Sequence, residues 1–380
     1  MIEHDYKELF SNDSIDKQLV IATDDGVINI TNTELHENSF ELNESISSDN
    51  SLKFGTVISS SVKFTVSNVF TGLKNKWITL TMSMNRNVSN PFKFGRYKAY
   101  SDIPTADRKK RDIVAYDALY DVLQEDVSEW YNTLLPNENS TATLKEFRDS
   151  FFSHFGIEQE EAVLINDVMI VTKTIQPEKL SGKTVINAIC EINGCFGHIG
   201  RNGKFKYIYL TPIQEGLYPS ENLYPSENLY PAEPNTNLLK TGHYISAAYE
   251  DFIVEKIDKL QIRQEEDEIG AIIGSGNNIY VIQDNFLLYG KSEEELQTIG
   301  QYIFSKIGGI YYRPFSAKAK GNPCLEVGDG ISLSTKYMAI HSYILQRTLT
   351  GIQALRDEYT AEGTQYQPSE VNSTARSIQQ

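Results

Sequence analysis

Residues 92–122 read FKFGRYKAYSDIPTADRKKRDIVAYDALYDV, and a change of pattern inside this stretch decides the fold. Its first ten residues are rich in aromatic side chains and partly alternating, which is typical of a β-strand. After Asp112, a strand-like IVAY gives way to an apolar 3–4 spacing, which predicts a helix with one face made of Ala118, Leu119, Val122 and Leu123. A strand-rich segment therefore ends near residue 111, and an α+β segment begins at 112.

The chain before this stretch also has the pattern of strands. KQLVIAT, GVINI, SFELN, GTVISSSVKFTVSNVF and KWITLTMSM are short, rich in Val, Ile, Thr and aromatic residues, and separated by Gly, Asn and Asp. No part of 1–111 has a convincing helical period. We therefore expect an antiparallel barrel or sandwich over 1–111.

The chain after it, 112–212, carries clear helix and hairpin signals. TLKEFRDSFFSHFG begins with a capping box formed by Thr143 and Glu146. SGKTVINAICEING predicts a further helix, with an apolar face made of Val185, Ile186, Ile189 and Cys190. CFGHIGRNGKFKYIYL then predicts a hairpin around Asn202-Gly203. These elements predict a small α+β domain.

Strands return in the last third of the chain. HYISAAYEDFIVEKIDKLQIRQ, NNIYVIQDN, YYRPFSAKA, LEVGDGISLS and MAIHSYILQRTLTG all lie within 241–361. One helix interrupts them, in SEEELQTIGQYIFSKIGG, and it starts at a capping box of Ser292 and Glu295. The remaining residues, 362–380, are polar, and we expect them to fray or to continue into a partner contact.

A short repeat separates the second and third parts. LYPSEN-LYPSEN-LYPAEP lies within 213–240, and its regular Pro favours extended or polyproline II backbone. The segment is either an exposed, semi-rigid spacer or an arm that lays Leu-Tyr-Pro units on a neighbouring surface. If it is an arm, the predicted interface residues are Tyr218, Pro219, Tyr224, Pro225, Tyr230 and Pro231.

Composition narrows the class of protein. The 380 residues are 40% hydrophobic and carry a formal net charge of −16, which indicates a globular chain of two or three domains and argues against a general nucleic-acid binder. The three cysteines form no disulfide framework, which favours synthesis in a reducing cytoplasm. We expect no signal peptide and no membrane anchor, because no sufficiently long apolar run is present.

The charge is unevenly distributed. Residues 1–50 hold 12 acidic and 2 basic side chains, whereas residues 51–111 hold 2 acidic and 12 basic ones. The two stretches are either ordinary solvated faces of one sheet, or they attract each other or the opposite stretch of a neighbouring copy.

The sequence contains only weak matches to motifs for catalysis, phosphate binding or metal binding. Ser181-Gly182-Lys183-Thr184 suggests a phosphate-binding loop, but Pro177 stands where that motif needs a glycine. Cys190, Cys195 and His198 match no common zinc spacing, so core thiols are the better interpretation. No nucleophile motif is visible. We therefore predict no enzyme, no catalytic residues, no metal and no cofactor.

The order of motifs resembles that of phage tail hub proteins. The opening stretch contains a G-r-Y group, a t-a-d-r segment and an i-t-a-Y-D group in the order that is typical of these proteins. TLKEFRDSFFSHFGIE, SGKTVINAICEINGCFGHIGRNGKFKYIYL, the Tyr-Pro-Ser repeat, YYRPFSAKAKGNPCLEVGDGISLS and YILQRTLTGIQALRDEYTAEG follow in sequence. Over about residues 50–365 the chain resembles the N-terminal hub region of the prophage tail endopeptidase, or tail-associated lysin, family. Through that family it is similar to baseplate hub proteins of contractile tails and of type VI secretion spikes.

The resemblance implies a fold and an assembly. The fold class would be α+β, mostly β, with two tube-like antiparallel β-barrel domains at 1–111 and 241–361 and a small α+β domain inserted at 112–212. Family members are trimers, whose pseudo-six-fold ring requires heterologous contacts. The resemblance implies that the chain forms a homotrimer. The other implied partners are the distal tail protein ring, the tape-measure protein, and a tail fibre, spike or receptor-binding protein. The hub region of the family has no cofactor and no catalytic residues.

The resemblance also implies a location and a function. We expect a virion structural protein of the tail-tip baseplate, made in the host cytoplasm, that serves host attachment and DNA ejection through a ring channel. DNA would pass only transiently, and an acidic lumen would repel it. Because the hub pattern ends shortly before Gln380, we expect no lysin activity. The alternatives are a tail-tip cell-wall hydrolase and a carbohydrate-binding host-adhesion module, but we expect Trp77 and Trp130 to pack in the core.

Overall fold

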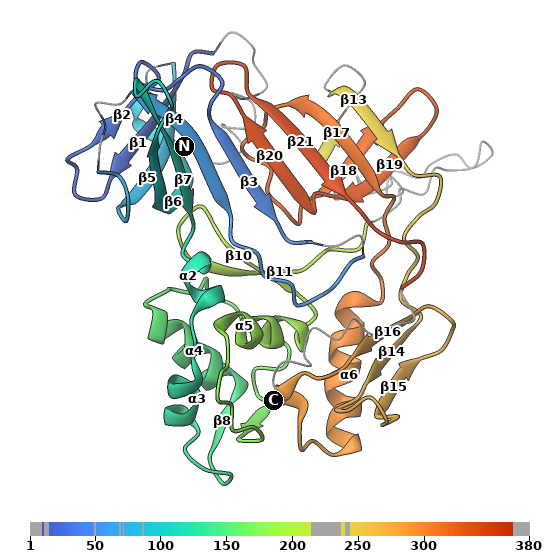
Figure 1. Cartoon of the computed structure of the whole chain (residues 1–380). Helices are drawn as coiled ribbons and strands as arrows, with labels where there is room; N and C mark the ends of the chain where they lie inside the picture. Colours follow the sequence, from blue (N-terminus) through green and yellow to red (C-terminus); the bar gives the residue numbers. More distant parts are fainter. Residues whose placement is uncertain are drawn as a thin grey trace.

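The structure is a computed structural model of the 380-residue chain. Figure 1 shows two layers, with a long sheet above and, below it, a group of helices beside a smaller unit made of one helix and a sheet. The residues that the structure describes are 10, 15–48, 51–67, 70, 72–85, 87–213, 237–239 and 244–367. Within these ranges, no helix has the length and apolar character needed to cross a membrane.

The first part of the long sheet comes from the strand-rich segment before the opening helix. Buried and exposed positions alternate along its strands, so one face of the sheet packs on the core. Every strand pairs antiparallel with its neighbour. The strands are β1 (Lys17–Thr23), β2 (Asn29–Ile30), β3 (Glu41–Ser45), β4 (Ser61–Ser67), β5 (Trp77–Met84), β6 (Asn87–Pro104) and β7 (Lys110–Tyr116).

The last third of the chain completes the same sheet. Its strands are β13 (Tyr244–Tyr249), β17 (Phe315–Lys320), β20 (Gln346–Thr350) and β21 (Arg356–Ala361). β20 pairs antiparallel with β3, with Thr348 opposite Asn43. The resulting 11-stranded sheet has the order β13-β17-β21-β20-β3-β4-β7-β6-β5-β1-β2.

The expected fold class, α+β with mostly β-structure, is confirmed. We expected the two strand-rich segments to form separate tubes. Within the single chain, strands of both segments belong to one sheet. That sheet is open among the described residues, since its end strands β13 and β2 do not pair with each other. The ladder continues across β3 and β20 because both strands have an unpaired edge there and matching polar and apolar faces. The tube-like form stays a prediction.

The first part of the sheet curls, although no ladder closes it. Gln353, in the turn after β20, reaches the start of β1 on the far side of this part. Its amide accepts from the Lys17 N–H at 3.1 Å and donates to the Lys17 carbonyl at 2.7 Å. One side chain thus takes the place that a paired strand would fill.

The first group of helices is the predicted α+β segment. The capping box of Thr143 and Glu146 is confirmed, and so is the hairpin, where Gly203 has a φ of 78°. The helix α3 was not predicted. The elements are α2 (Leu119–Gln124), α3 (Ser128–Leu134), β8 (Thr141–Thr143), α4 (Leu144–Phe155), β9 (Ile170–Thr172), α5 (Gly182–Glu191), β10 (Phe196–Ile199) and β11 (Phe205–Ile208).

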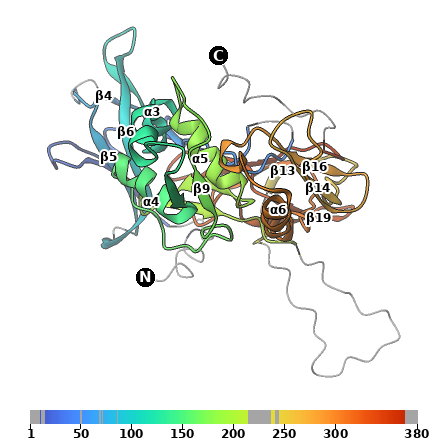
Figure 2. The same ribbon diagram turned by 90° about the horizontal axis from the view of Figure 1, so that it is seen from below.

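The second group is a smaller α/β unit in the last third of the chain. The strands β14 (Lys259–Ile262), β15 (Ala271–Gly274) and β16 (Ile279–Ile282) form a sheet covered by α6 (Glu293–Ile307), whose predicted capping box is confirmed. A turn of 3₁₀ helix, η1 (Phe286–Leu288), contacts α5. Figure 2 shows this unit beside α3, α4 and α5. A separate three-stranded sheet joins β12 (Asn237–Leu239), β18 (Gly330–Ser334) and β19 (Ala339–Tyr343).

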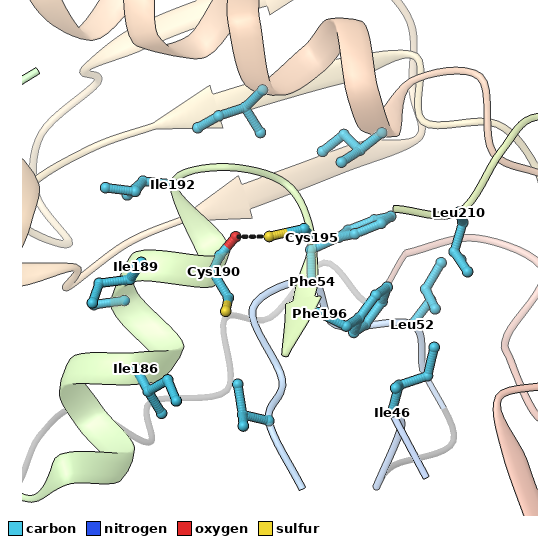
Figure 3. Packing of buried hydrophobic residues seen from close by; sticks show 14 of the residues in the cluster. Ile46, Leu52, Phe54, Ile186, Ile189, Cys190, Ile192, Cys195, Phe196 and Leu210 are labelled. Carbon is cyan, nitrogen blue, oxygen red and sulfur yellow. Dashed lines mark hydrogen bonds between the residues drawn. The ribbon is translucent and has the colours of Figure 1, made fainter. Parts of the chain in front are cut away.

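One hydrophobic core passes through both helix groups. The predicted apolar face of α5, which includes Ile186 and Ile189, is buried in it. The segment between β3 and β4 runs through this core, where Phe54 packs against Phe196 with ring centroids 5.3 Å apart (Figure 3). The Phe54 N–H also donates to the Tyr280 hydroxyl at 2.9 Å. A separate core fills the first part of the long sheet.

Candidate functional site

The predicted contact residues of the Leu-Tyr-Pro repeat lie outside the described residues. These are Tyr218, Pro219, Tyr224, Pro225, Tyr230 and Pro231. Their role in contacts stays a prediction.

The sequence Ser181-Gly182-Lys183-Thr184 forms the start of α5. The Ser181 hydroxyl accepts a hydrogen bond from the Thr184 N–H at 3.1 Å, as an N-cap does. A Cβ added at Gly182 would overlap the carbonyl oxygen of Val122, because α2 lies directly against this helix start. The glycine therefore serves the packing of two helices, and its N–H donates to the Glu125 carbonyl at 2.9 Å.

Cys190 and Cys195 are core thiols, as predicted. Both are fully buried, and the Cys195 thiol donates to the Cys190 carbonyl at 3.4 Å (Figure 3). Burial raises the pKa of Cys190 well above its ordinary value. The third member of the suggested zinc set, His198, points to a different partner: its Nε2 lies 3.7 Å from Glu44 Oε1.

A buried ionic cluster lies where the two parts of the long sheet meet. Arg347 on β20 is 2% exposed. Its Nε donates to Asp357 Oδ1 at 2.8 Å and its Nη1 to Glu44 Oε2 at 3.1 Å. The remaining donors bond to the carbonyl oxygens of Leu325 at 2.6 Å and Asn322 at 3.1 Å. Three strands and one loop therefore converge on a single guanidinium group.

The hairpin β10–β11 attaches to the same cluster. Burial acts to raise the pKa of Glu44, but the contact with His198 and the charge of Arg347 together lower it to about 2. Arg201, in the hairpin turn, bonds to the Leu325 carbonyl at 2.9 Å and pairs with Glu326 at 3.2 Å. The ionic cluster thus connects the lower layer to both parts of the sheet.

The sequence contains a signal for this cluster that motif reading did not use. In alternating strands, Glu44 follows Leu42 on the buried face, Arg347 precedes Leu349, and Asp357 precedes Tyr359. A charged residue at an inward position needs a partner of opposite charge. Three such positions in different strands predict that those strands meet.

The opposite face of the long sheet is polar. One row of cross-strand neighbours runs along it from β13 to β5, and none of its members is buried. Because paired residues point to the same side of a sheet, this row is continuous across both parts of the chain. Its members are Ser246, Lys318, Glu358, Thr348, Asn43, Ser61, Tyr116, Lys98 and Trp77.

Ion pairs neutralise much of this polar face. Lys63 pairs with Glu41 at 3.2 Å, and Lys318 lies 3.5 Å from Glu358. Three pairs join the acidic stretch 1–50 to the basic stretch 51–111, namely Lys63–Glu41, Lys76–Asp25 and Arg96–Asp24. The interpretation that these two stretches attract each other is confirmed for these pairs.

The expectation that Trp77 packs in the core is wrong. It is half-buried on the polar face, because its position in β5 is one residue out of register with the buried side chains. The Arg96 guanidinium lies over its ring, 4.3 Å from the centroid. Trp130 does pack in the core, at 8% exposure.

An aromatic cluster stands at the end of the same face. Tyr116 and Tyr120 stack with ring centroids 4.1 Å apart, and Tyr100 completes the cluster. The Tyr100 hydroxyl donates to Asp121, which also accepts from Lys98 at 2.9 Å. The cluster is held in place by its own contacts, and it has the amphipathic character of a protein contact surface.

The geometry of the polar face determines what it can do. Several of its cations, among them Lys63, Lys98 and Lys318, lie beside carboxylates. This pairing lowers the local potential, so a polyanion gains less by binding there. Hydroxyl, amide and paired charged groups suit a hydrated surface that touches other molecules reversibly.

Solved structures that share this fold include two with TM-scores above 0.5. The 43 kDa tail protein of prophage MuSo2 from Shewanella oneidensis has a TM-score of 0.53 and 10% sequence identity, over 91% of this chain and 97% of that one. The tail protein from Neisseria meningitidis MC58 has a TM-score of 0.51 and 7% identity, over 91% and 97%. The prophage tail protein gp18 from Listeria monocytogenes EGD-e scores 0.48, with 12% identity over 91% and 95%.

No family model matches the chain, and no curated protein matches it. The fold is nevertheless shared with these two tail proteins, and the order of sequence motifs had pointed to a resemblance of the same kind. At 7% and 10% identity the likeness concerns the fold, and function has to be argued from the surfaces of this chain.

The buried ionic cluster generates a stability prediction. Replacing Arg347 with Met leaves Asp357 and Glu44 buried without their cation, which should cost about 3–5 kcal/mol. Lys318→Met is the matched control, because it breaks an exposed pair with Glu358 and should cost less than about 1 kcal/mol. Urea unfolding of both variants measures the difference. Equal losses would show that the cluster does not hold the sheet together.

A half-buried acid lies between α5 and the α6 unit. Glu191 ends α5, and its Oε2 accepts from Asn285 Nδ2 at 2.9 Å. Burial raises the pKa of Glu191 to about 7, although the Asn285 hydrogen bond and the charge of Lys53 act in the opposite direction. The folded protein therefore favours the protonated acid.

This raised pKa predicts a pH dependence. The stability from protonated Glu191 is fully present below its ordinary pKa of 4.5 and is lost as the pH rises through about 7. Glu191→Gln keeps a neutral group, so above pH 7 it should be more stable than the natural chain, by up to about 3 kcal/mol. The control is Glu138→Gln, which is exposed. A pH series of unfolding midpoints in which Glu191→Gln and Glu138→Gln change alike would contradict this.

Proposed function

We propose that this chain is the hub of a phage tail-tip baseplate, a structural protein that joins the distal end of the tail tube to fibres or a spike. The observation that carries the proposal is the fold shared with two tail proteins, one of them from a prophage, over nearly their full length. The proposed partners are further copies in a homotrimer, the distal tail protein ring, the tape-measure protein, and a fibre, spike or receptor-binding protein. The location is the virion tail tip.

In the proposed trimer, the long sheet of each copy would form part of a ring. We propose that 1–111 and 241–361 act as two tube-like units per copy, so that three copies form a ring of six. The curl that Gln353 closes with its amide supports the first of these units. The segments 112–212 and 213–240 would form an inserted domain and a contact arm between them, with 362–380 as a tail.

The polar face is the proposed lining of the ring channel. Tape measure and DNA must slide through without being held. A face on which cations such as Lys63 and Lys318 are paired with carboxylates offers fewer free cations to phosphates. Low adhesion would then come from paired charges in addition to the net acidity of the chain.

The proposal predicts an assembled particle. Purified chain should have the mass of three 43.0 kDa copies in solution, and negative-stain images should show a ring. A stable monomer that binds no tail protein would contradict the hub. Release of soluble fragments from peptidoglycan by the purified chain would contradict the purely structural role.

The Leu-Tyr-Pro arm has its own test. Replacing Tyr218, Tyr224 and Tyr230 with Ala should weaken trimer or baseplate assembly, because the rings are the proposed contact groups. Asn222→Ala with Asn228→Ala is the matched control in the same repeat. Counting assembled particles for both variants decides the question. Normal assembly of the triple Tyr variant would leave the segment as a spacer.

A further inference from the structure

The hairpin between β6 and β7 ends in a basic turn that the ion pairs of the polar face do not neutralise. Arg108 and Lys109 are exposed, and among the described residues neither has an ion-pair partner. Ile103, at the end of β6, is 61% exposed. We call these three residues the basic tip.

The basic tip is held in one shape by its neighbours. The Thr105 N–H donates to the Lys110 carbonyl at 2.9 Å, and Asp107 accepts from Thr105 Oγ1 at 2.7 Å and from the Lys109 N–H at 3.0 Å. Asp102 pairs with Arg111 at 2.5 Å. Both nearby carboxylates are thus used within the hairpin, and Arg108 and Lys109 face solvent as net positive charge.

A surface of opposite charge lies in the α6 unit. The turn between β14 and β15 exposes Glu265, Glu266, Asp267 and Glu268, and the next residue, Ile269, is 73% exposed. Arg263, just before this turn, donates from Nε to Gln283 Oε1 at 2.8 Å and from Nη1 to the Glu266 carbonyl at 2.7 Å. We call 265–269 the acidic turn.

The two surfaces belong to different parts of the molecule. β6 and β7 lie in the upper layer of Figure 1, and β14 and β15 lie in the lower layer on the opposite side. They do not contact each other within the chain.

We propose that the basic tip of one copy docks on the acidic turn of a second copy. The two surfaces match in charge, and each adds one exposed isoleucine, Ile103 or Ile269, that contact would bury. A contact between two different surfaces is heterologous and can close into a ring.

A second copy fits the basic tip better than a nucleic acid does. Binding to a polyanion relies on many cations along its path. The basic tip offers Arg108 and Lys109 beside an apolar side chain, a combination that suits a small acidic and apolar surface on a protein.

Charge reversal tests the contact. In the full chain, Arg108→Glu with Lys109→Glu should raise the dissociation constant for self-association about tenfold. Glu265→Lys with Glu268→Lys should do the same. All four substitutions in one chain should restore association, because the reversed surfaces again attract. Lys179→Glu with Lys183→Glu is the control, with the same change in net charge at exposed sites.

The readout is sedimentation of each variant over a range of protein concentrations. Association of the natural chain should weaken between about 0.1 M and about 1 M salt, as the Debye length falls from ~10 Å to ~3 Å. Restored association in the four-fold variant is the expected result, since general loss of folding cannot produce it.

The inference rests on the proposed function only because it requires that copies of the chain associate. Three outcomes would overturn it. If the natural chain assembles and both reversed variants assemble equally well, this contact is wrong while the hub proposal stands. If the natural chain is monomeric at every concentration, both fail. If the Arg108 and Lys109 variant assembles normally but loses affinity for duplex DNA, the basic tip is a nucleic-acid contact.

Discussion

The guanidinium of Arg347 is the group on which the joining of the two strand-rich segments depends. It lies under the sheet with Asp357 on one neighbouring strand and Glu44 on the other. A slip of one residue between β3 and β20 would turn Glu44 to the polar face and leave a buried cation partly unpaired. The ionic cluster therefore selects one register, and through His198 and Arg201 it places the hairpin β10–β11 and the helices beneath the same point.

Features set by a few adjacent residues were predictable from sequence. The capping boxes at Thr143 and Ser292 and the turn at Asn202-Gly203 need only local hydrogen bonds and backbone preferences, and they occur as predicted. The order of motifs also led to the correct fold class. Trp77 shows the limit, because its place in a strand was evident but the face it occupies depends on which neighbours pair with that strand.

Features set by distant pairings were not predictable in this way. Periodicity within β3 or β20 says that each is a strand, but not that the two pair, and so the continuous sheet was not predicted. The polar face also depends on distant pairings, because its row of cross-strand neighbours exists only when nine strands are paired in register. The attraction of the acidic and basic stretches was suggested by charge counts alone, whereas the partners, such as Arg96 with Asp24, required the fold.

The sheet junction also constrains how the protein is made. Glu44 and its partner Arg347 are 303 residues apart in the sequence. At a synthesis rate of roughly 5–20 residues per second, about 15–60 s separate the appearance of β3 from that of β20. During this interval the edge of β3 has no partner, and such an edge can pair with strands of other nascent chains. A complete sheet, and with it any assembly that uses both ends of the sheet, can arise only after β21 has been synthesised.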